Sequence, residues 1–226
     1  MAYFARRARD RQTQQRNAVS NEQRLQKGIS ALNLELDLDI QQELMEFVNL
    51  LVKWNRVYNL TSVRKPQDMI ARHVLDSLAV LPFVEGPRVL DIGTGAGLPG
   101  LVLALVRPDW EVVLLDSSNK KLRFVRQAIT DLALENASVE HIRIEEYQPP
   151  ALFDTVISRA FSSLQDMVEY GSPVCRPEGK ILAMKGVYPV TEVEALTDPS
   201  VVQSVERLEV PQLNAERHVV LLNRTE

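Results

Sequence analysis

The chain has 226 residues, of which 45% are hydrophobic and 25% charged, with a formal net charge of −4; this composition is typical of a globular domain with an ordinary core. No apolar run approaches the roughly 20 residues that span a bilayer, and the N-terminus carries no hydrophobic signal core, so we expect a cytoplasmic protein with no membrane partner. The single cysteine, Cys175, excludes an internal disulfide, and the three scattered histidines lack the spacing of metal ligands, so we expect no metal.

Positive charge is concentrated at the N-terminal end. Residues 1–27 carry a net charge of +5, which leaves −9 for the rest of the chain. Such a segment is typical of a solvated tail, but a basic arm can also contact nucleic-acid phosphates, with an affinity that falls as salt rises. We expect residues 1–21 to form a basic, disordered arm and leave its role open.

The next stretch predicts helices. Apolar residues recur at helical spacing over 25–32 and again over 40–54. A polar connector follows over 55–63, and Pro66 begins a third helix that extends to about residue 81. Residues 22–85 are therefore expected to form a mostly helical N-terminal portion.

The third predicted helix carries three polar residues beside its apolar stripe. Arg72, His73 and Asp76 lie off the centre of that stripe. They face either solvent or a substrate near the glycine-rich turn that follows. We take Arg72 and His73 as candidate RNA contacts.

From residue 86 onward the pattern alternates between strands and helices. The predicted strands are 88–92, 111–115, 138–144, 154–158 and 180–185, and the predicted helices between them are 98–106, 119–134 and 163–175. Repeated strand–helix units imply a parallel sheet with helices on both faces. Two last strands, 201–210 and 218–223, have no room for a helix between them and predict a C-terminal antiparallel hairpin. We expect residues 86–226 to form an α/β domain with a Rossmann-like sheet.

A glycine-rich turn follows the first of these strands. The sequence VLDIGTGAGLPG (89–100) passes from an apolar strand through Gly93, Gly95 and Gly97 into an apolar helix. Glycine lets the backbone approach a ligand closely and adopt positive φ. The helix that follows offers its free N–H groups to an anionic or polar ligand. This is a nucleotide-type binding turn.

Two ligand classes use such a turn. The glycines satisfy the dinucleotide pattern G-x-G-x-x-G, so NAD is one candidate. S-adenosylmethionine is the other, and three features favour it. Asp91 can hold the ligand's ammonium group, or instead only close the turn; Asp116, at the end of the second strand, can accept the ribose hydroxyls; and the terminal hairpin is not expected of a simple dinucleotide half-fold.

Five stretches, in order, resemble one enzyme family. They are YNLTSVRKPQDMIARHVLDSL (58–78), VLDIGTGAGLPG (89–100), RPDWEVVLLDSSNKKLRFVRQ (107–127), FDTVISRAF (153–161) and ERHVVLLNR (216–224). The chain resembles the RsmG family, also called GidB (glucose-inhibited division protein B), over about residues 22–224. The resemblance implies an S-adenosylmethionine-dependent methyltransferase with a Rossmann-like fold. It also implies a substrate, N7 of guanine 527 in the 530 loop of 16S rRNA, and a partner, the 30S subunit or its precursor.

The resemblance also implies cofactor contacts. They fall on Gly93, Leu98, Ile144, Glu145 and Arg159. Adenine is expected to lie at Ile144 and Glu145, after the third strand. Asp91, Asp116 and the turn glycines complete the predicted cofactor site.

The expected chemistry needs few catalytic groups. Guanine N7 carries a free lone pair, so methyl transfer needs alignment and exclusion of water but no general base. Accordingly, the chain has no Asn/Asp-Pro-Pro-aromatic tetrapeptide and no cysteine pair. Arg159 is expected beside the reacting base with a positioning role, or else paired with Asp91 or Glu145. Phe161 is expected to stack on the base.

Other cations are candidate RNA contacts. Lys185, at the end of the fifth strand, is a candidate phosphate or base contact. The predicted helix 119–134 carries a cationic cluster that is either its solvated face or part of an RNA path; the cluster consists of Lys120, Lys121 and Arg123. Two alternative functions stay open: a non-catalytic rRNA-binding assembly factor that retains the cofactor turn, and an NAD-dependent oxidoreductase. A monomer is favoured.

Overall fold

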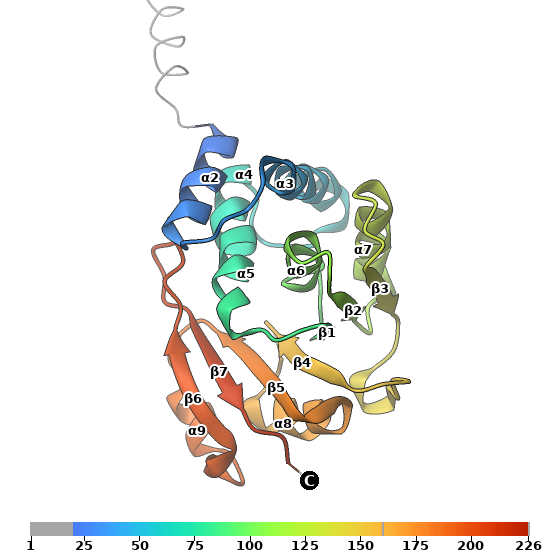
Figure 1. Cartoon of the computed structure of the whole chain (residues 1–226), viewed down its shortest axis with the longest axis vertical. Coiled ribbons are helices and arrows are strands. Elements are labelled where there is room, and N and C mark those ends of the chain that lie inside the picture. Colours follow the sequence, from blue (N-terminus) through green and yellow to red (C-terminus); the bar gives the residue numbers. More distant parts are fainter. Residues whose placement is uncertain (1–19, 160, 226) are drawn as a thin grey trace, which may run out of the picture.

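The computed structural model describes residues 20–159 and 161–225 (Figure 1). The predicted basic arm therefore lies almost wholly outside the described residues. Among them, no helix is both long and apolar enough to cross a bilayer. The same residues hold no group of three or more His, Cys, Asp or Glu side chains arranged to bind a metal ion.

The N-terminal portion is helical, as predicted. Its elements are α2 (Asn21–Ala31), α3 (Leu38–Tyr58), α4 (Pro66–Met69), the π-helix η1 (Ile70–Leu75), α5 (Asp76–Ala79) and the 3₁₀-helix η2 (Leu81–Phe83). A capping box formed by Ser20 and Gln23 starts α2. The third predicted helix is thus α4, η1 and α5 in succession, with a wide π turn in its middle. Such turns are frequent at functional sites.

A seven-stranded sheet, with helices on both faces, forms the rest of the fold. Its strands are β1 (Arg88–Ile92), β2 (Glu111–Leu115), β3 (Ala137–Glu140), β4 (Phe153–Ser158), β5 (Cys175–Lys185), β6 (Val202–Arg207) and β7 (His218–Leu222). They lie in the order β3-β2-β1-β4-β5-β7-β6. Strands β1 to β5 are parallel, whereas β7 is antiparallel to both β5 and β6. The predicted α/β sheet with a C-terminal hairpin is confirmed.

Two apolar clusters cover the two faces of the sheet. Successive strand residues alternate between them, so that Val112 and Leu114 join one cluster and Val113 and Leu115 the other. The first cluster packs against α3, α6 (Gly100–Val106) and α7 (Asn119–Asp131), and the second against α8 (Leu164–Gly171) and α9 (Val190–Glu194). Figure 1 shows these helices on opposite sides of the sheet.

Several predicted boundaries were wrong. The helix predicted over 163–175 ends as α8 at Gly171 and continues as the 3₁₀-helix η4 (Ser172–Val174), because Pro173 tightens the last turn and β5 begins at once. The helix predicted over 119–134 ends at Asp131, since Ala133 takes a positive φ of 50°. The helix predicted over 98–106 begins only at Gly100, with Pro99 as its N-cap.

The outer strands are also shorter than predicted. The strand expected over 138–144 ends at Glu140, and the 3₁₀-helix η3 (Ile144–Glu146) follows. This strand lies at the edge of the sheet and pairs only with β2, so few ladder bonds extend it. The run 201–210 likewise forms a strand only over Val202–Arg207.

The glycine turn gives a stability prediction. Gly97 has a φ of +78°, and an added Cβ would lie 2.3 Å from Cδ1 of the buried Leu101. We expect Gly97→Ala to lower the free energy of unfolding by about 2–4 kcal/mol, from backbone strain and overpacking together. Urea unfolding followed by circular dichroism measures the change.

Gly186→Ala is the matched control, because an added Cβ there has nothing within 4 Å and φ is not positive. It should change stability by less than about 0.5 kcal/mol. Equal losses in the two variants would contradict the strain assigned to Gly97.

Candidate functional site

Two hollows lie at the carboxyl ends of the parallel strands, where open α/β sheets bind their ligands. The smaller, here called the strand-end hollow, has a volume of about 170 Å³, and its lining includes Gly93, Asp116, Ile144, Glu145 and Phe161. The larger, here called the arginine pocket, has a volume of about 290 Å³; it is lined by Thr61, Ser62, Val63, Arg72, His73, Asp76, Arg159, Met184, Lys185, Gly186 and Arg217. The segment after β4 contributes to both hollows, because Arg159 lines the arginine pocket and Phe161 lines the strand-end hollow.

The glycine turn is tied to the end of β2. The backbone N–H groups of Gly93 and Thr94 both donate to the carbonyl of Leu115, at 2.8 and 3.0 Å. Gly93 has a φ of +66°, and a Cβ added there would meet nothing within 4 Å. The surface above Gly93 is therefore open to a ligand, and it lines the strand-end hollow.

Asp91 lies beneath this turn with no exposed surface. Its Oδ2 accepts hydrogen bonds from Thr94 Oγ1 at 2.5 Å and from the Gly100 N–H at 2.8 Å, so the carboxylate does close the turn. Its Oδ1 is buried without a partner among the described residues. Burial raises the pKa of Asp91 to about 7, against the lowering effect of these two hydrogen bonds.

Asp116, which follows β2, also holds the glycine turn. Its carboxylate accepts hydrogen bonds from the backbone N–H groups of Gly95 at 2.9 Å and Ser118 at 2.7 Å. Buried Ile144 and exposed Glu145, both in η3, line the same hollow. The structure thus brings Asp116, Gly93 and the η3 pair together. Leu98 is buried in the core next to the turn and does not line the hollow.

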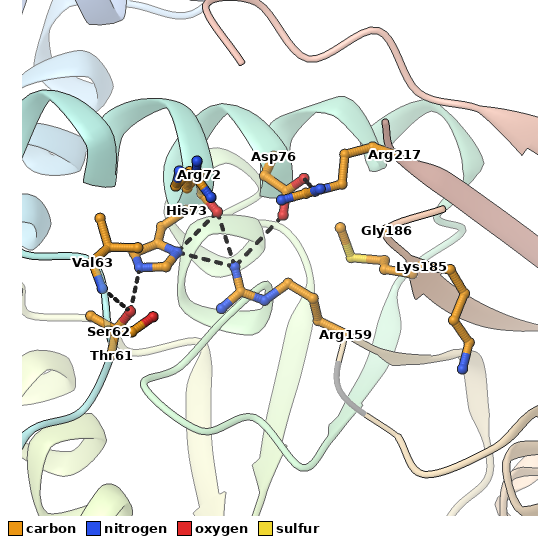
Figure 2. A pocket seen from close by; sticks show the side chains of 11 residues that line it. Thr61, Ser62, Val63, Arg72, His73, Asp76, Arg159, Lys185, Gly186 and Arg217 are labelled. Carbon is orange, nitrogen blue, oxygen red and sulfur yellow. Dashed lines mark hydrogen bonds and ion pairs between the residues drawn. The ribbon is translucent and has the colours of Figure 1, made fainter. Parts of the chain in front are cut away.

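A buried ionic cluster organises the arginine pocket (Figure 2). The Asp76 carboxylate, 3% exposed, accepts a hydrogen bond from Arg217 Nε at 2.8 Å and lies 3.7 Å from an Arg159 guanidinium nitrogen. Burial raises the pKa of Asp76, and the two arginines oppose that rise. Burial lowers the pKa of Arg159, and the negative charges of Asp76 and Asp91 oppose that lowering.

This cluster corrects one expectation. Among the ion pairs of the described residues, Arg159 pairs with Asp76 rather than with Asp91 or Glu145. The pairing joins α5 to the segment after β4, and Arg217 adds the turn before β7. Sequence reasoning missed Arg217, because 141 positions separate it from Asp76 and no local spacing relates the two.

His73 is held by hydrogen bonds at both ring nitrogens. Nδ1 lies 2.9 Å from the Arg72 carbonyl and 3.3 Å from an Arg159 guanidinium nitrogen. The carbonyl can only accept, so the shorter contact assigns the proton to Nδ1. Nε2 then accepts from Thr61 Oγ1 at 2.9 Å. Burial, followed by the charge of Arg159, lowers the pKa of His73 to about 4. The His73 side chain is therefore neutral and links η1 to the connector of residues 55–63. Figure 2 shows the His73 ring beside the Arg159 guanidinium.

The remaining predicted cations lie in different places. Arg72 is exposed at the pocket rim, and its carbonyl accepts from Arg159 at 3.3 Å. Lys185 lines the pocket but turns its amine away from Arg159 (Figure 2), to a bond of 2.7 Å with Glu192. The α7 cations are exposed and line neither hollow; they are Lys120, Lys121 and Arg123. Lys121 nevertheless lies near the strand-end hollow, because its Nζ is 3.9 Å from a carboxylate oxygen of Asp116.

Comparison with known proteins identifies the family. Residues 40–220 match the family model described as rRNA small subunit methyltransferase G, GidB. The chain belongs to the rRNA small subunit methyltransferase G family.

Curated relatives in this family cover nearly the whole chain. The ribosomal RNA small subunit methyltransferase G of Nitrosococcus oceani is 48% identical over 88% of this chain and 92% of its own length. The protein of the same name from Yersinia enterocolitica is 49% identical over 86% of this chain and 95% of its own. Membership of the methyltransferase G family confirms the predicted methyltransferase over the oxidoreductase.

Solved structures confirm the fold alone. The O-methyltransferase TomG from Streptomyces achromogenes, solved with SAM, superposes with a TM-score of 0.55 at 17% identity and covers 80% of this chain and 90% of its own. The structure of TrmN from Thermus thermophilus gives a TM-score of 0.53 at 20% identity, over 76% of this chain and 53% of its own. The Rossmann-like sheet of the methyltransferase G family is thus shared with other methyltransferases.

The histidine gives a pH prediction. The His73 pKa is lowered from 6.5 to about 4 in the folded protein, so between these values the unfolded chain binds a proton that the folded chain does not. The stability that neutral His73 contributes above pH 6.5 is therefore lost as pH falls toward 4, by up to about 3 kcal/mol. Asp91, whose pKa is raised to about 7, contributes with the opposite sign over the same range. The His73 contribution is therefore read as a difference: the free energy of unfolding of the wild type minus that of His73→Gln should fall by up to about 3 kcal/mol between pH 6.5 and 4.

His141→Gln is the control, because His141 is exposed. Its curve should keep the wild-type slope between pH 6.5 and 4. A His73→Gln curve with the full wild-type slope would contradict the neutral, doubly bonded state of His73.

Proposed function

We propose that this chain transfers the methyl group of S-adenosylmethionine to N7 of a guanine in the 530 loop of 16S rRNA. The observation that carries the proposal is the shared segment after β4, which lines both a hollow at the glycine turn and a cationic pocket. A cofactor and a nucleotide can thus lie next to each other. Family membership supplies the substrate.

The strand-end hollow fits the cofactor. The unpartnered Oδ1 of Asp91 is a buried acceptor that suits the cofactor's ammonium group, reached directly or through water. Asp116 would accept the ribose hydroxyls, and Ile144 and Glu145 would flank adenine. The open surface over Gly93 leaves room for the backbone to touch the ligand.

The arginine pocket suits the target base. Arg159 is held by Asp76, so its guanidinium is oriented before a substrate arrives. An arginine that donates to guanine O6 would fix the plane of the base and the direction of N7. Phe161, which is partly exposed in the neighbouring hollow, would stack on the ring.

The cofactor, once bound, supplies the electrophilic methyl carbon. The protein holds the base in line with that carbon and excludes water. No group of the arginine pocket is arranged as a base: both His73 nitrogens are engaged within the protein, and the Asp76 carboxylate is paired with two arginines. This arrangement suits guanine N7, which carries a free lone pair and no proton that a base would have to remove.

The outer cations extend the proposed RNA contacts. Arg72 and Lys185 lie at the pocket, whereas Lys120, Lys121 and Arg123 form an exposed face on α7, from which Lys121 also pairs with Asp116. We assign the α7 face to phosphate contacts, which add affinity without sequence preference. The proposed partner is accordingly 16S rRNA, free or within the 30S subunit or its precursor.

The role of Arg159 gives a kinetic prediction. We expect Arg159→Ala to lower kcat/KM for methylation of 30S subunits by about 10- to 100-fold, because a charge-assisted contact to the base is lost. The fold should persist, since Asp76 keeps its bond to Arg217. Transfer of a radiolabelled methyl group measures the rate, and circular dichroism checks the fold.

Arg207→Ala is the control, because Arg207 is exposed on β6 and, within residues 20–159 and 161–225, forms an ion pair only with the neighbouring Glu209. It should methylate at the wild-type rate. Wild-type turnover by Arg159→Ala would remove Arg159 from the reaction.

A further inference from the structure

Large apolar side chains are exposed together just after β5. Val187, Tyr188 and Val190 are 70%, 51% and 50% exposed. The other large exposed apolar residues of the described chain, such as Val57 and Leu152, lie apart from one another in the sequence. Adjacent exposed apolar residues of this kind mark interaction sites more often than single ones do. We call Val187, Tyr188 and Val190 the apolar platform.

The platform begins where the arginine pocket ends. Lys185 and Gly186, the two residues before it, line that pocket, and Figure 2 shows both at one side of it. A molecule that fills the pocket and extends past Gly186 therefore meets the platform next.

The platform is held in place from beneath. His218 Nδ1 donates to the Gly186 carbonyl at 3.2 Å, and the His218 ring meets the Tyr188 ring edge-on with centroids 5.6 Å apart. Lys185 and Glu192 pair at 2.7 Å, and Glu192 also accepts from the Leu164 N–H at 3.1 Å. The segment is thus tied to β7 and to α8, so its apolar side chains are presented outward in a fixed position.

The charges around the platform favour a nucleic acid as its partner. The lining of the neighbouring pocket holds three arginines, Arg72, Arg159 and Arg217, against the single carboxylate of Asp76. On the platform's own helix, Glu192 is neutralised by Lys185, and Glu194 lies one helical turn beyond Val190. An aromatic ring next to positive charge is the combination that binds single-stranded nucleic acid, by stacking on bases and attracting phosphates.

We propose that the apolar platform, through Tyr188, stacks a base of single-stranded RNA next to the nucleotide in the arginine pocket. The inference rests on the proposed function, because it assigns the flanking RNA of the same substrate to this surface. It adds a specificity contact outside the reacting centre, one that favours an unpaired segment over a duplex.

The test compares Tyr188→Ala with Tyr188→Phe. The probe is a synthetic 530-loop RNA hairpin with a fluorescent label, and its Kd is measured by anisotropy; KM for 30S subunits is measured in parallel. Tyr188→Ala should weaken RNA binding and raise KM by about tenfold, while Tyr188→Phe, which keeps the ring, should stay within about twofold of wild type. Affinity for S-adenosylhomocysteine should not change in either variant.

Val57→Ala is the matched control, because Val57 is 73% exposed on α3 and lines neither hollow. It should bind the hairpin like wild type. Wild-type RNA affinity in Tyr188→Ala would overturn the inference. A raised KM for 30S subunits with unchanged affinity for the hairpin would also overturn it, in favour of a ribosomal-protein contact. If the wild-type protein neither binds nor methylates RNA, the proposed function fails, and the inference fails with it.

Discussion

The carboxylate of Asp76, buried between Arg159 and Arg217, joins three parts of the chain that are distant in sequence. It docks the helical portion against the sheet, holds the segment after β4 and fixes the turn that enters β7. Removing one partner of a buried ion pair strands the remaining charge, so the three parts depend on one another. The same cluster sets the direction of the Arg159 guanidinium, and the proposed base pocket is built around it.

A second buried carboxylate organises the other half of the site. Asp91 closes the glycine turn through Thr94 and Gly100, and still keeps one oxygen without a partner. The two carboxylates are thus similarly buried but have different roles. Asp76 pairs with two arginines of the protein itself, whereas Asp91 retains an acceptor oxygen that suits a positively charged ligand. The arginine pocket and the strand-end hollow both take lining residues from the segment after β4, Arg159 and Phe161, which suits methyl transfer between two molecules bound side by side.

The sequence predicted what local patterns encode. Apolar runs and glycine spacing located β1, β2 and the turn, and the absence of a helix between the last two strands located the hairpin. Contacts between distant segments carry no such signal, so the Asp76–Arg217 bond was missed and the pairings considered for Arg159, with Asp91 or Glu145, did not include Asp76. The role expected of Ile144 and Glu145 rested on family resemblance, because their own pattern indicates only a strand end. The pair instead lies in η3, beyond the short edge strand β3.

The central claim is that this chain methylates one guanine of 16S rRNA at N7. The most direct measurement maps 7-methylguanine in 16S rRNA from cells that lack the gene and from the same cells carrying it again. The account predicts that the modified guanine in the 530 loop is absent from the first and restored in the second. A 530-loop guanine that stays methylated without the gene, or a modification lost at another nucleotide instead, would contradict it.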